Sequence, residues 1–379
     1  MIPCQRHLFD IPEGRAYLNC AYLSPLMKTA REAGERAVSR KSRPWKILRE
    51  DFFAEVEAVR AAYASLIGAA PDGVALIPAA SYGIATAAAN LPLERGQTIV
   101  VLDGQHASNW HAWADKAEQA GGSLRTAARP EGGQWTAAVL DAIGPETAIV
   151  AVPQCHWTDG ATVDLVALGE RCRAVGAALV IDATQSAGAM PLDLDAVRPD
   201  FVVAAGYKWL FCPYSFGFLY AAPQRRAGRP LEGHSFHRAG ARQSEGRTGY
   251  IREYEPGARR YDMGERANFI HLPMARAALD QLAAWGVEAI AASLRPLTET
   301  IANQAESRGW GLPLAESRAP HFIGIRPQAD LPADLVPALA ARGVHISLRG
   351  GCIRVSPHLY NTPADTSRLF ETLDEILPA

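Results

Sequence analysis

Short apolar runs alternate with segments of helical length along the chain from residue 74 onward. The runs are apolar on both faces, which is typical of parallel strands that helices cover from both sides. The runs predicted as strands span residues 74–78, 98–102, 147–153, 178–183, 201–205 and 216–220. We therefore expect an α/β fold with a mostly parallel central sheet and helices on both of its faces.

Helical periodicity marks the segments on either side of this alternation. Apolar residues recur at spacings of three and four over residues 44–67, which predicts an amphipathic helix that Gly68 ends. The same spacing predicts a second long helix from Phe269 onward. Residues 17–25 are predicted to form a short strand that ends in a turn.

The last part of the chain is predicted to form a smaller α+β unit. Its expected strands span residues 322–325, 344–347 and 352–356. Residues 224–263 are rich in Arg, Gly and Glu with little periodicity, which indicates a long connection with a functional or interfacial role. We expect a large domain over residues 15–265, and a small domain that joins residues 266–379 to residues 1–14.

Composition and charge narrow the class of partner. With 379 residues, of which 48% are hydrophobic and 21% charged, the chain can bury a sizeable core. Its formal net charge is −2 and it has no dense basic run, so we expect neither nucleic acid nor a membrane as partner. The expected partner is a small molecule.

The N-terminus and the cysteines bear on the compartment. The first residues lack a charged segment followed by an apolar one, and no apolar run approaches the ~20 residues of a membrane helix. The six cysteines are scattered, with no C-x-x-C pair and no His/Cys cluster at metal-ligand spacing. We expect a soluble cytoplasmic protein with reduced thiols and no metal site.

Asp182 and Lys208 each follow an apolar run, and parallel sheets bind their ligands beyond the carboxyl ends of the strands. Taken alone, Asp182 is equally explained as a helix N-cap, and Lys208 as a solvated surface lysine. Lys208, however, lies between Tyr207 and Trp209, and apolar surroundings lower the pKa of a lysine and make its amine a nucleophile. Together the pair suggests pyridoxal phosphate, with the lysine as its Schiff-base partner and the acid beside its pyridine nitrogen.

Residues 182–186 and 206–210 in combination resemble the class V aminotransferase family of fold-type I pyridoxal phosphate enzymes. This family includes cysteine desulfurases, kynureninases and isopenicillin N epimerase, and the resemblance extends from Tyr17 to about Leu373. It implies that Asp182 pairs with the pyridine nitrogen, that Gln185 bonds the ring hydroxyl, and that Lys208 carries the cofactor.

The same resemblance extends to further cofactor contacts. Residues 105–109 resemble the family's Glu-His-x-x-Asn segment, which implies that His106 stacks on the cofactor ring. Ala80 and Ser81 follow a strand and open a helix, where backbone N–H groups and the helix dipole favour a phosphate. Tyr207 is implied to reach the phosphate with its hydroxyl.

One position near the ring hydroxyl stays open between alternatives. Gln154 follows the strand over residues 147–153, near where relatives often have an asparagine. Counting back from Gly160 instead places His156 or Trp157 there.

Residues 353–362 resemble the family's arginine strand, which a Tyr-Asn-Thr segment follows. The resemblance implies that Arg354 grips the substrate α-carboxylate, and the alternative is a structural ion pair. Arg349 is a second candidate for this task. Tyr22 is expected at the surface that contacts the substrate.

Two departures from the family pattern change the expected chemistry. Desulfurases carry a nucleophilic cysteine on a mobile loop before the arginine, and the five residues from Arg349 to Ile353 leave no room for such a loop. Cys352 is therefore expected to be a packed thiol. Glu265 stands where many relatives have a threonine that reaches the phosphate of the neighbouring subunit, so Asn268 or a backbone N–H is the expected substitute.

We expect a homodimeric pyridoxal phosphate enzyme that acts on the α-amino group of an amino acid, with Lys208 as proton shuttle. Transamination comes first because it needs no further group, and a β-lyase of the C–S lyase type or an epimerase is the alternative. A catalytically silent relative is the competing non-enzyme class, against which the retained Lys208 and Asp182 argue. A nicotinamide dinucleotide enzyme lacks the expected G-x-G-x-x-G.

Overall fold

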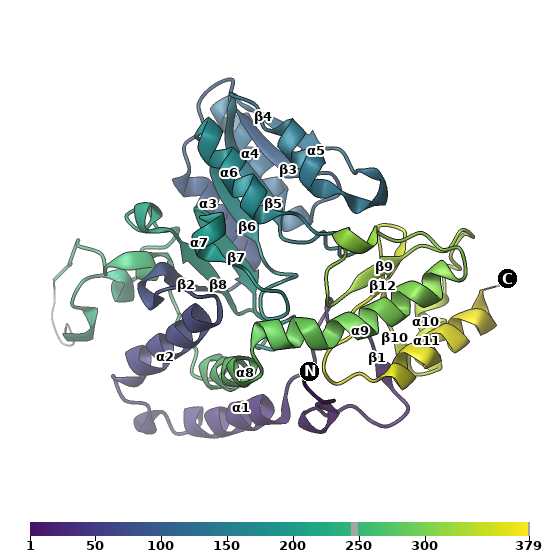
Figure 1. Cartoon of the computed structure of the whole chain (residues 1–379). Helices are drawn as coiled ribbons and strands as arrows, with labels where there is room; N and C mark the ends of the chain where they lie inside the picture. The colour runs from purple at the N-terminus through teal and green to yellow at the C-terminus, as the bar shows by residue number, and fades with distance from the viewer. Residues whose placement is uncertain (244–248, 378–379) are drawn as a thin grey trace.

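The computed structural model describes residues 1–243 and 249–377, and a seven-stranded sheet forms its centre (Figure 1). The strand order is β2-β8-β7-β6-β5-β3-β4. The strands are β2 (Val74–Ile77), β3 (Thr98–Leu102), β4 (Ser123–Ala127), β5 (Thr147–Pro153), β6 (Ala178–Asp182), β7 (Phe201–Ala205) and β8 (Gly217–Ala221). All neighbours pair in parallel except β8, which is antiparallel to both β2 and β7. The predicted α/β fold with a mostly parallel sheet is thus confirmed.

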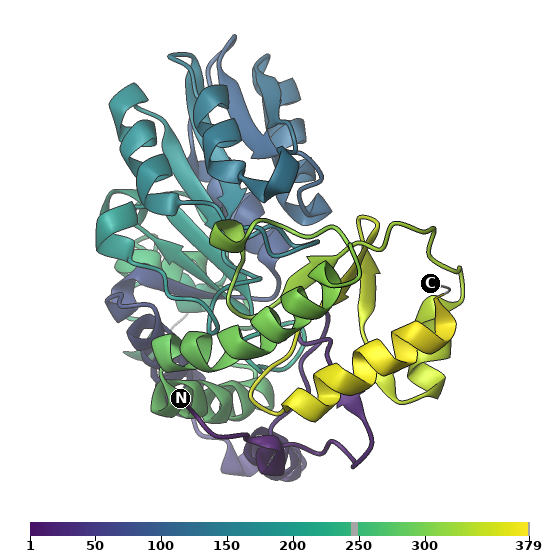
Figure 2. The same ribbon diagram turned by 45° about the vertical axis from the view of Figure 1, so that its right-hand side comes forward.

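Helices cover both faces of this sheet, because alternate strand residues point to opposite sides and both sets are apolar. The helices α3 (Ala80–Asn90) and α4 (His111–Ala120) pack on one face. The helices α5 (Trp135–Ala142), α6 (Leu165–Val175) and the short α7 (Leu194–Val197) pack on the other. Both layers are visible around the central strands in Figures 1 and 2.

Three further helices, α1 (Lys28–Lys41), α2 (Asp51–Leu66) and α8 (His271–Trp285), pack against one another below the sheet. The predicted helix over residues 44–67 begins later than expected, because the carboxylate of Asp51 accepts a hydrogen bond from the Leu48 N–H at 2.6 Å. Residues 44–46 form a separate 3₁₀ turn that leaves Trp45 exposed. Gly68 takes a left-handed φ of +68° just after the helix, as predicted for its end.

The smaller part of the molecule contains two further sheets. Strands β9 (Ile323–Ile325), β11 (Ser347–Arg349) and β12 (Cys352–Val355) form an antiparallel sheet in the order β11-β12-β9. Strand β10 (Val344–His345) pairs in parallel with β1 (Ala16–Tyr17). The strand predicted over residues 344–347 is therefore split at Ile346 between two sheets. The helices here are α9 (Val287–Glu306), α10 (Leu335–Ala341) and α11 (Pro363–Ile376).

Helix α9 joins the two parts (Figure 2). Its residues Ile290 and Leu294 belong to the buried cluster below the central sheet, whereas Ile301 and Ala305 belong to the core of the smaller part. The division into domains at residues 265 and 266 stays a prediction.

The long connection predicted over residues 224–263 contains short 3₁₀ turns, among them Ser235–His237 and Gly257–Tyr261. Residues 244–248 of this connection lie outside the described residues. Within the part of the chain that the structure describes, no helix has the length and apolar character needed to cross a membrane.

Candidate active site

One edge of the central sheet carries the carboxyl ends of all its strands except β8, which runs the other way and begins there. A cavity of about 390 Å³ lies at this edge and is here called the sheet-edge cavity. A second cavity of about 410 Å³, the arginine cavity, adjoins it and includes Tyr22, Leu23, Arg349 and Arg354 in its wall. The residues common to both walls are His106, Trp157, Tyr207, Lys208 and Tyr214. Each cavity is large enough for a small organic molecule.

The loop after β7 presents Lys208 to both cavities. Gly206 is needed for this turn, because a β-carbon there would lie 2.8 Å from the Cys212 β-carbon. Phe211 and Ser215 in the same loop have left-handed φ values of 53° and 59°, which are strained for residues other than glycine. The sequence thus forms a tightly bent loop around the lysine, and strained backbone of this kind is concentrated at functional sites.

Lys208 is 7% exposed and makes no ion pair with any residue in the ranges 1–243 and 249–377. Burial, and then the positive charge of Arg354, lower the pKa of Lys208 to about 8, against the attraction of Asp182. A substantial fraction of the amine is therefore unprotonated near neutral pH and able to act as nucleophile or base.

Asp182 ends β6 with its carboxylate in the wall of the sheet-edge cavity. Its Oδ1 accepts a hydrogen bond from the Thr184 N–H at 3.0 Å, and the side chain makes no ion pair within the described residues. A carboxylate that is 8% exposed and lacks a cation is costly to keep charged. The cavity beside it is therefore suited to a cationic group.

Gln185 ties the N-terminal segment to this edge of the sheet. Its Oε1 accepts a hydrogen bond from Trp209 Nε1 at 2.9 Å, and its Nε2 donates to the Ala21 carbonyl at 3.1 Å. The second Nε2 hydrogen has no partner within the described residues. The Ser24 N–H also donates to the Tyr207 carbonyl at 3.1 Å, so residues 21–24 close the arginine cavity beside the lysine loop.

The N-terminus of α3 points at the sheet-edge cavity, with Ala80 and Ser81 in the cavity wall. Ala79 provides no side-chain cap, so the first N–H groups of the helix have no partner from the helix itself. Gly83 allows the helix to lie this close to the sheet, because a β-carbon there would meet Val203 Cγ1 at 2.8 Å. Free N–H groups at the positive end of a helix make an anion site.

His106 and Tyr207 complete the wall shared by the cavities. The His106 ring is edge-on to Trp157, with 5.4 Å between ring centroids, and its Nδ1 accepts a weak hydrogen bond from the Ser108 N–H at 3.4 Å. Burial, and then the charge of Lys208, lower the pKa of His106, so its ring is neutral at pH 7. The Tyr207 ring lies 5.5 Å from Lys208 Nζ.

Arg354 on β12 is a buried guanidinium with no carboxylate partner. It is 1% exposed, and it donates from Nε to Ser347 Oγ at 3.2 Å and from Nη1 to the Trp157 carbonyl at 2.8 Å. Within the described residues it makes no ion pair, so the alternative of a structural ion pair is not observed. Burial and the charge of Arg349 lower the pKa of Arg354 to about 9, and it remains charged at pH 7.

Arg349 and Tyr22 lie together in the wall of the arginine cavity. The Arg349 guanidinium is 5.5 Å from the centroid of the Tyr22 ring, and its Nη1 donates to the Leu348 carbonyl at 2.7 Å. Tyr22 is 53% exposed, so it forms the outer rim of the cavity.

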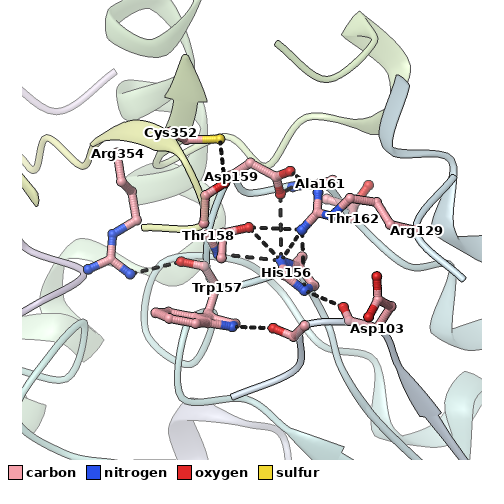
Figure 3. A network of polar contacts seen from close by, with 12 residues as sticks. Asp103, Arg129, His156, Trp157, Thr158, Asp159, Ala161, Thr162, Cys352 and Arg354 are labelled. Atoms are coloured by element: carbon pink, nitrogen blue, oxygen red, sulfur yellow. Dashed lines mark hydrogen bonds and ion pairs between the residues drawn. The ribbon is translucent and has the colours of Figure 1, made fainter. Parts of the chain in front are cut away.

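A polar network holds Trp157 against Arg354 (Figure 3). His156 stacks on Trp135, with ring centroids 5.1 Å apart, and its Nδ1 lies 2.7 Å from Thr158 Oγ1. Arg129 donates to Asp159 Oδ2 at 2.6 Å and also reaches Thr158 Oγ1 at 3.0 Å. These contacts fix the turn after β5 and thereby the carbonyl that Arg354 binds.

Some predicted residues do not reach the cavities. Gln154 points to the other side of β5, where its Nε2 donates to the Pro191 carbonyl at 2.7 Å, and Trp157 takes the place beside the lysine. Asn268 Oδ1 accepts from the Ile270 and His271 N–H groups and so caps α8, and the Glu265 side chain is 98% exposed. Cys352 is buried and faces a different cavity beside Asp159, as expected for a packed thiol.

Two cavity residues were missing from the sequence-based set. Tyr214 and Ser215 precede β8, and because β8 is antiparallel, its beginning meets the ligand edge. The run over residues 216–220 gave no sign of this reversal, although its short separation from β7 leaves no room for a crossover helix, which was an available signal.

The groups around the sheet-edge cavity fit pyridoxal phosphate. An anion site lies at the start of α3, a carboxylate without a cation at Asp182, and an amine of lowered pKa at Lys208. These are the three groups that a phosphate, a protonated pyridine nitrogen and an aldehyde require.

Comparison with known proteins supports this reading. The Aminotransferase class-V family model matches residues 26–369. The uncharacterized aminotransferase YcbU of Bacillus subtilis is 28% identical over 85% of this chain and 83% of its own length. Isopenicillin N epimerase of Streptomyces clavuligerus is 28% identical over 95% of this chain and 94% of its own length.

Among solved structures, a C-DES mutant with glycine covalently linked to its PLP cofactor has the same fold. Its TM-score is 0.87 at 17% identity, over 98% of this chain and 99% of that chain. The family match, the fold and the cavity chemistry agree with one another. The chain therefore belongs to the class V aminotransferase family, and it is an enzyme whose cofactor is pyridoxal 5′-phosphate.

Proposed function

We propose that this enzyme is an aminotransferase that acts on the α-amino group of an amino acid. The observation that carries the proposal is the meeting of three unpaired groups in two joined cavities. They are the Lys208 amine, the Asp182 carboxylate and the Arg354 guanidinium. A cofactor amine site next to an unoccupied cationic carboxylate site is what an α-amino acid substrate requires.

In this proposal each residue of the sheet-edge cavity has one task toward the cofactor. Lys208 holds it covalently, Asp182 faces the pyridine nitrogen, and the remaining Nε2 hydrogen of Gln185 reaches the ring hydroxyl. His106 lies on the ring face. Pyridoxal phosphate supplies an electron-withdrawing ring that makes the α-hydrogen of the amino acid acidic.

The phosphate is assigned to the start of α3. The N–H groups of Ala80 and Ser81 and the hydroxyl of Ser81 would bind it, and the Tyr207 hydroxyl would complete the contact. The helix dipole favours the anion at this end.

Arg354 is assigned to the substrate α-carboxylate. Its Nη1 and Nε are held by Trp157 and Ser347, which fixes the guanidinium plane and leaves Nη2 for the substrate. A fixed guanidinium orients the substrate so that the α-hydrogen lies near Lys208 Nζ. With a pKa of about 8, that amine can remove the α-proton and return it elsewhere.

Transamination, β-elimination and epimerisation share these steps and differ in where the proton goes next. Transamination needs Lys208 alone, which is why we place it first. Burial raises the pKa of the Cys155 thiol in the cavity wall, and Cys352 faces another cavity, so neither supplies a thiolate to the substrate. The arrangement thus gives no support to persulfide-forming desulfuration.

The test is an ultraviolet-visible and product assay on the purified holoenzyme with a panel of amino acids. Accumulation of the pyridoxamine form, with an equal amount of the 2-oxo acid, is the expected result. Pyruvate and ammonia without pyridoxamine would make it a β-lyase, and inversion at the α-carbon an epimerase. Lys208→Ala is expected to lose the visible band of the bound cofactor, whereas Lys46→Ala, at an exposed lysine, keeps it.

We also propose that the enzyme works as a homodimer in a reducing compartment such as the cytoplasm. Exposed apolar side chains surround the arginine cavity, among them Leu23 and Tyr214, at 43% and 65% exposure, and a second subunit would cover them. All six cysteines are free thiols. Light scattering of the holoenzyme at micromolar concentration tests the dimer, and a monomer mass would reject it.

A further inference from the structure

We propose that the amino acid substrate carries a second anionic group on its side chain, and that Arg349 binds this group while Arg354 binds the α-carboxylate. The inference rests on the proposed function, because it takes Arg354 as the α-carboxylate site. It adds the substrate class, acidic amino acids, and a residue that selects for them.

The hairpin of β11 and β12 places both arginines on one face. Arg354 is paired directly opposite Ser347, whose hydroxyl it contacts at 3.2 Å. Arg349 lies two residues beyond Ser347 on the same strand, and residues two apart on a strand share a face. Arg349 and Arg354 are therefore diagonal neighbours, with backbone positions about 7–8 Å apart.

A rigid turn fixes this spacing. Gly350 and Gly351, with φ of +54° and +76°, connect the strands as a two-residue turn with both residues in the left-handed region. A β-carbon on Gly350 would meet Thr158 Cγ2 at 3.0 Å, so the turn packs against the loop that also holds Arg354. The two guanidinium groups are thus presented from one supported hairpin.

The charge in the arginine cavity is unbalanced. Its wall contains Arg349, Arg354 and Lys208 and no carboxylate. Neither arginine makes an ion pair in the part of the chain that the structure describes, and each donates to a backbone carbonyl instead. Elsewhere, Arg129 at the rim of a neighbouring cavity is neutralised by Asp159.

One α-carboxylate neutralises one of these two guanidinium groups. The second remains partly buried beside Tyr22, at a place where an unpaired charge is unfavourable and an anion gains charge-assisted hydrogen bonds. The charge of Arg349 also lowers the pKa values of Arg354, Lys208 and His106, which means that it acts on the same cavity. A substrate with two acid groups matches both cations.

The test compares unreactive acids on the holoenzyme, so that binding is measured without turnover. Calorimetric titration with succinate and glutarate, against butyrate and pentanoate, isolates the second carboxylate at equal chain length. We expect the dicarboxylates to bind about 10- to 100-fold more tightly, as one charge-assisted hydrogen-bonded contact allows. Equal affinity for both classes would overturn the proposal.

Variants assign the effect to one side chain. Arg349→Gln is expected to reduce the preference for dicarboxylates to within about threefold, Arg349→Lys to restore part of it, and Arg342→Gln to leave it unchanged. Arg342 is a matched control because it is exposed and pairs with Glu375 away from the cavity. A preference that survives in Arg349→Gln would refute the role of Arg349.

The two proposals can fail separately. Dicarboxylate-selective binding in an enzyme that forms no pyridoxamine would support the substrate class and reject transamination. Transamination of neutral amino acids at the same kcat/KM as acidic ones would support the reaction and reject the second anion site.

Discussion

Gly83 offers a direct test of the idea that packing of α3 on the sheet builds the anion site. In Gly83→Ala, the new β-carbon would lie 2.8 Å from both Ile77 Cδ1 and Val203 Cγ1 and 3.0 Å from Val203 Cγ2. The Ile77 terminal methyl can rotate away, but the branched Val203 side chain on the buried strand β7 cannot. The helix must therefore move outward.

The size of the effect follows from two opposing terms. Alanine is favoured over glycine in a helix by about 1 kcal/mol, whereas overpacking a core costs about 1–3 kcal/mol. The displaced helix end also weakens an anion interaction that is worth up to about 2 kcal/mol. Loss of roughly half of that interaction corresponds to about five- to tenfold weaker cofactor binding.

The assay is a titration of the apoenzyme with pyridoxal phosphate, followed at the absorbance of the bound form, together with a thermal melt of the apoenzyme. Gly34→Ala is the matched control, because Gly34 also lies inside a helix but faces the flexible side chain of Met274 at 2.7 Å. We expect unchanged cofactor affinity in this control. Cofactor affinity and melting temperature like those of the wild type in Gly83→Ala would refute the argument.

Three further predictions concern the arginine anchor, a buried ion pair and the histidines. Arg354→Lys keeps the charge but loses the planar fork, so we expect KM to rise about 10- to 100-fold with a smaller change in kcat, by steady-state kinetics. Asp262→Asn leaves Arg60 buried without its anion, both side chains being 0% exposed, and is expected to cost about 3–5 kcal/mol of unfolding free energy in urea. Burial lowers the pKa of His321 to about 4 and that of His358 to about 3, so the unfolded chain binds more protons below about pH 6.5. The unfolding free energy should therefore fall as the pH falls from about 6.5 to 4.

Controls sharpen each of these results. A normal KM in Arg354→Lys would show that the substrate carboxylate binds elsewhere. Asp280→Asn removes an exposed pair with Arg276 and is expected to cost less than about 1 kcal/mol. His358→Phe is expected to lessen the acid sensitivity, and an identical pH profile would contradict the role of buried histidines.

The parts of the fold that could be read from the sequence are those that large apolar side chains determine. The strands over residues 98–102, 147–153 and 201–205 have the predicted bounds because every second residue is apolar on both faces. Helix α1 was not predicted, because its buried face consists of Ala30, Ala33, Gly34 and Ala37, which carry little hydrophobic signal. Strand β4 was missed because it is a half-exposed edge strand.

The same limits explain what was and was not foreseen at the site. Residues at the carboxyl ends of apolar strands, such as Asp182 and Lys208, are found by counting from those strands. Arg129 follows the missed β4, so its contact with the Thr158 turn was not foreseen. Gln154 was expected at the ring because strand counting gives the position of a residue but not the side of the sheet that its side chain faces.

The hydrogen bond from Arg354 to the Trp157 carbonyl crosses between the smaller part of the molecule and the turn after β5. The anchor for the substrate is thus also a fastening between the two parts. A ligand that requires this arrangement depletes every state in which the parts separate, by simple mass action. Substrate supply therefore protects the enzyme against local opening and proteolysis, so its lifetime in the cell would rise with the demand for its reaction.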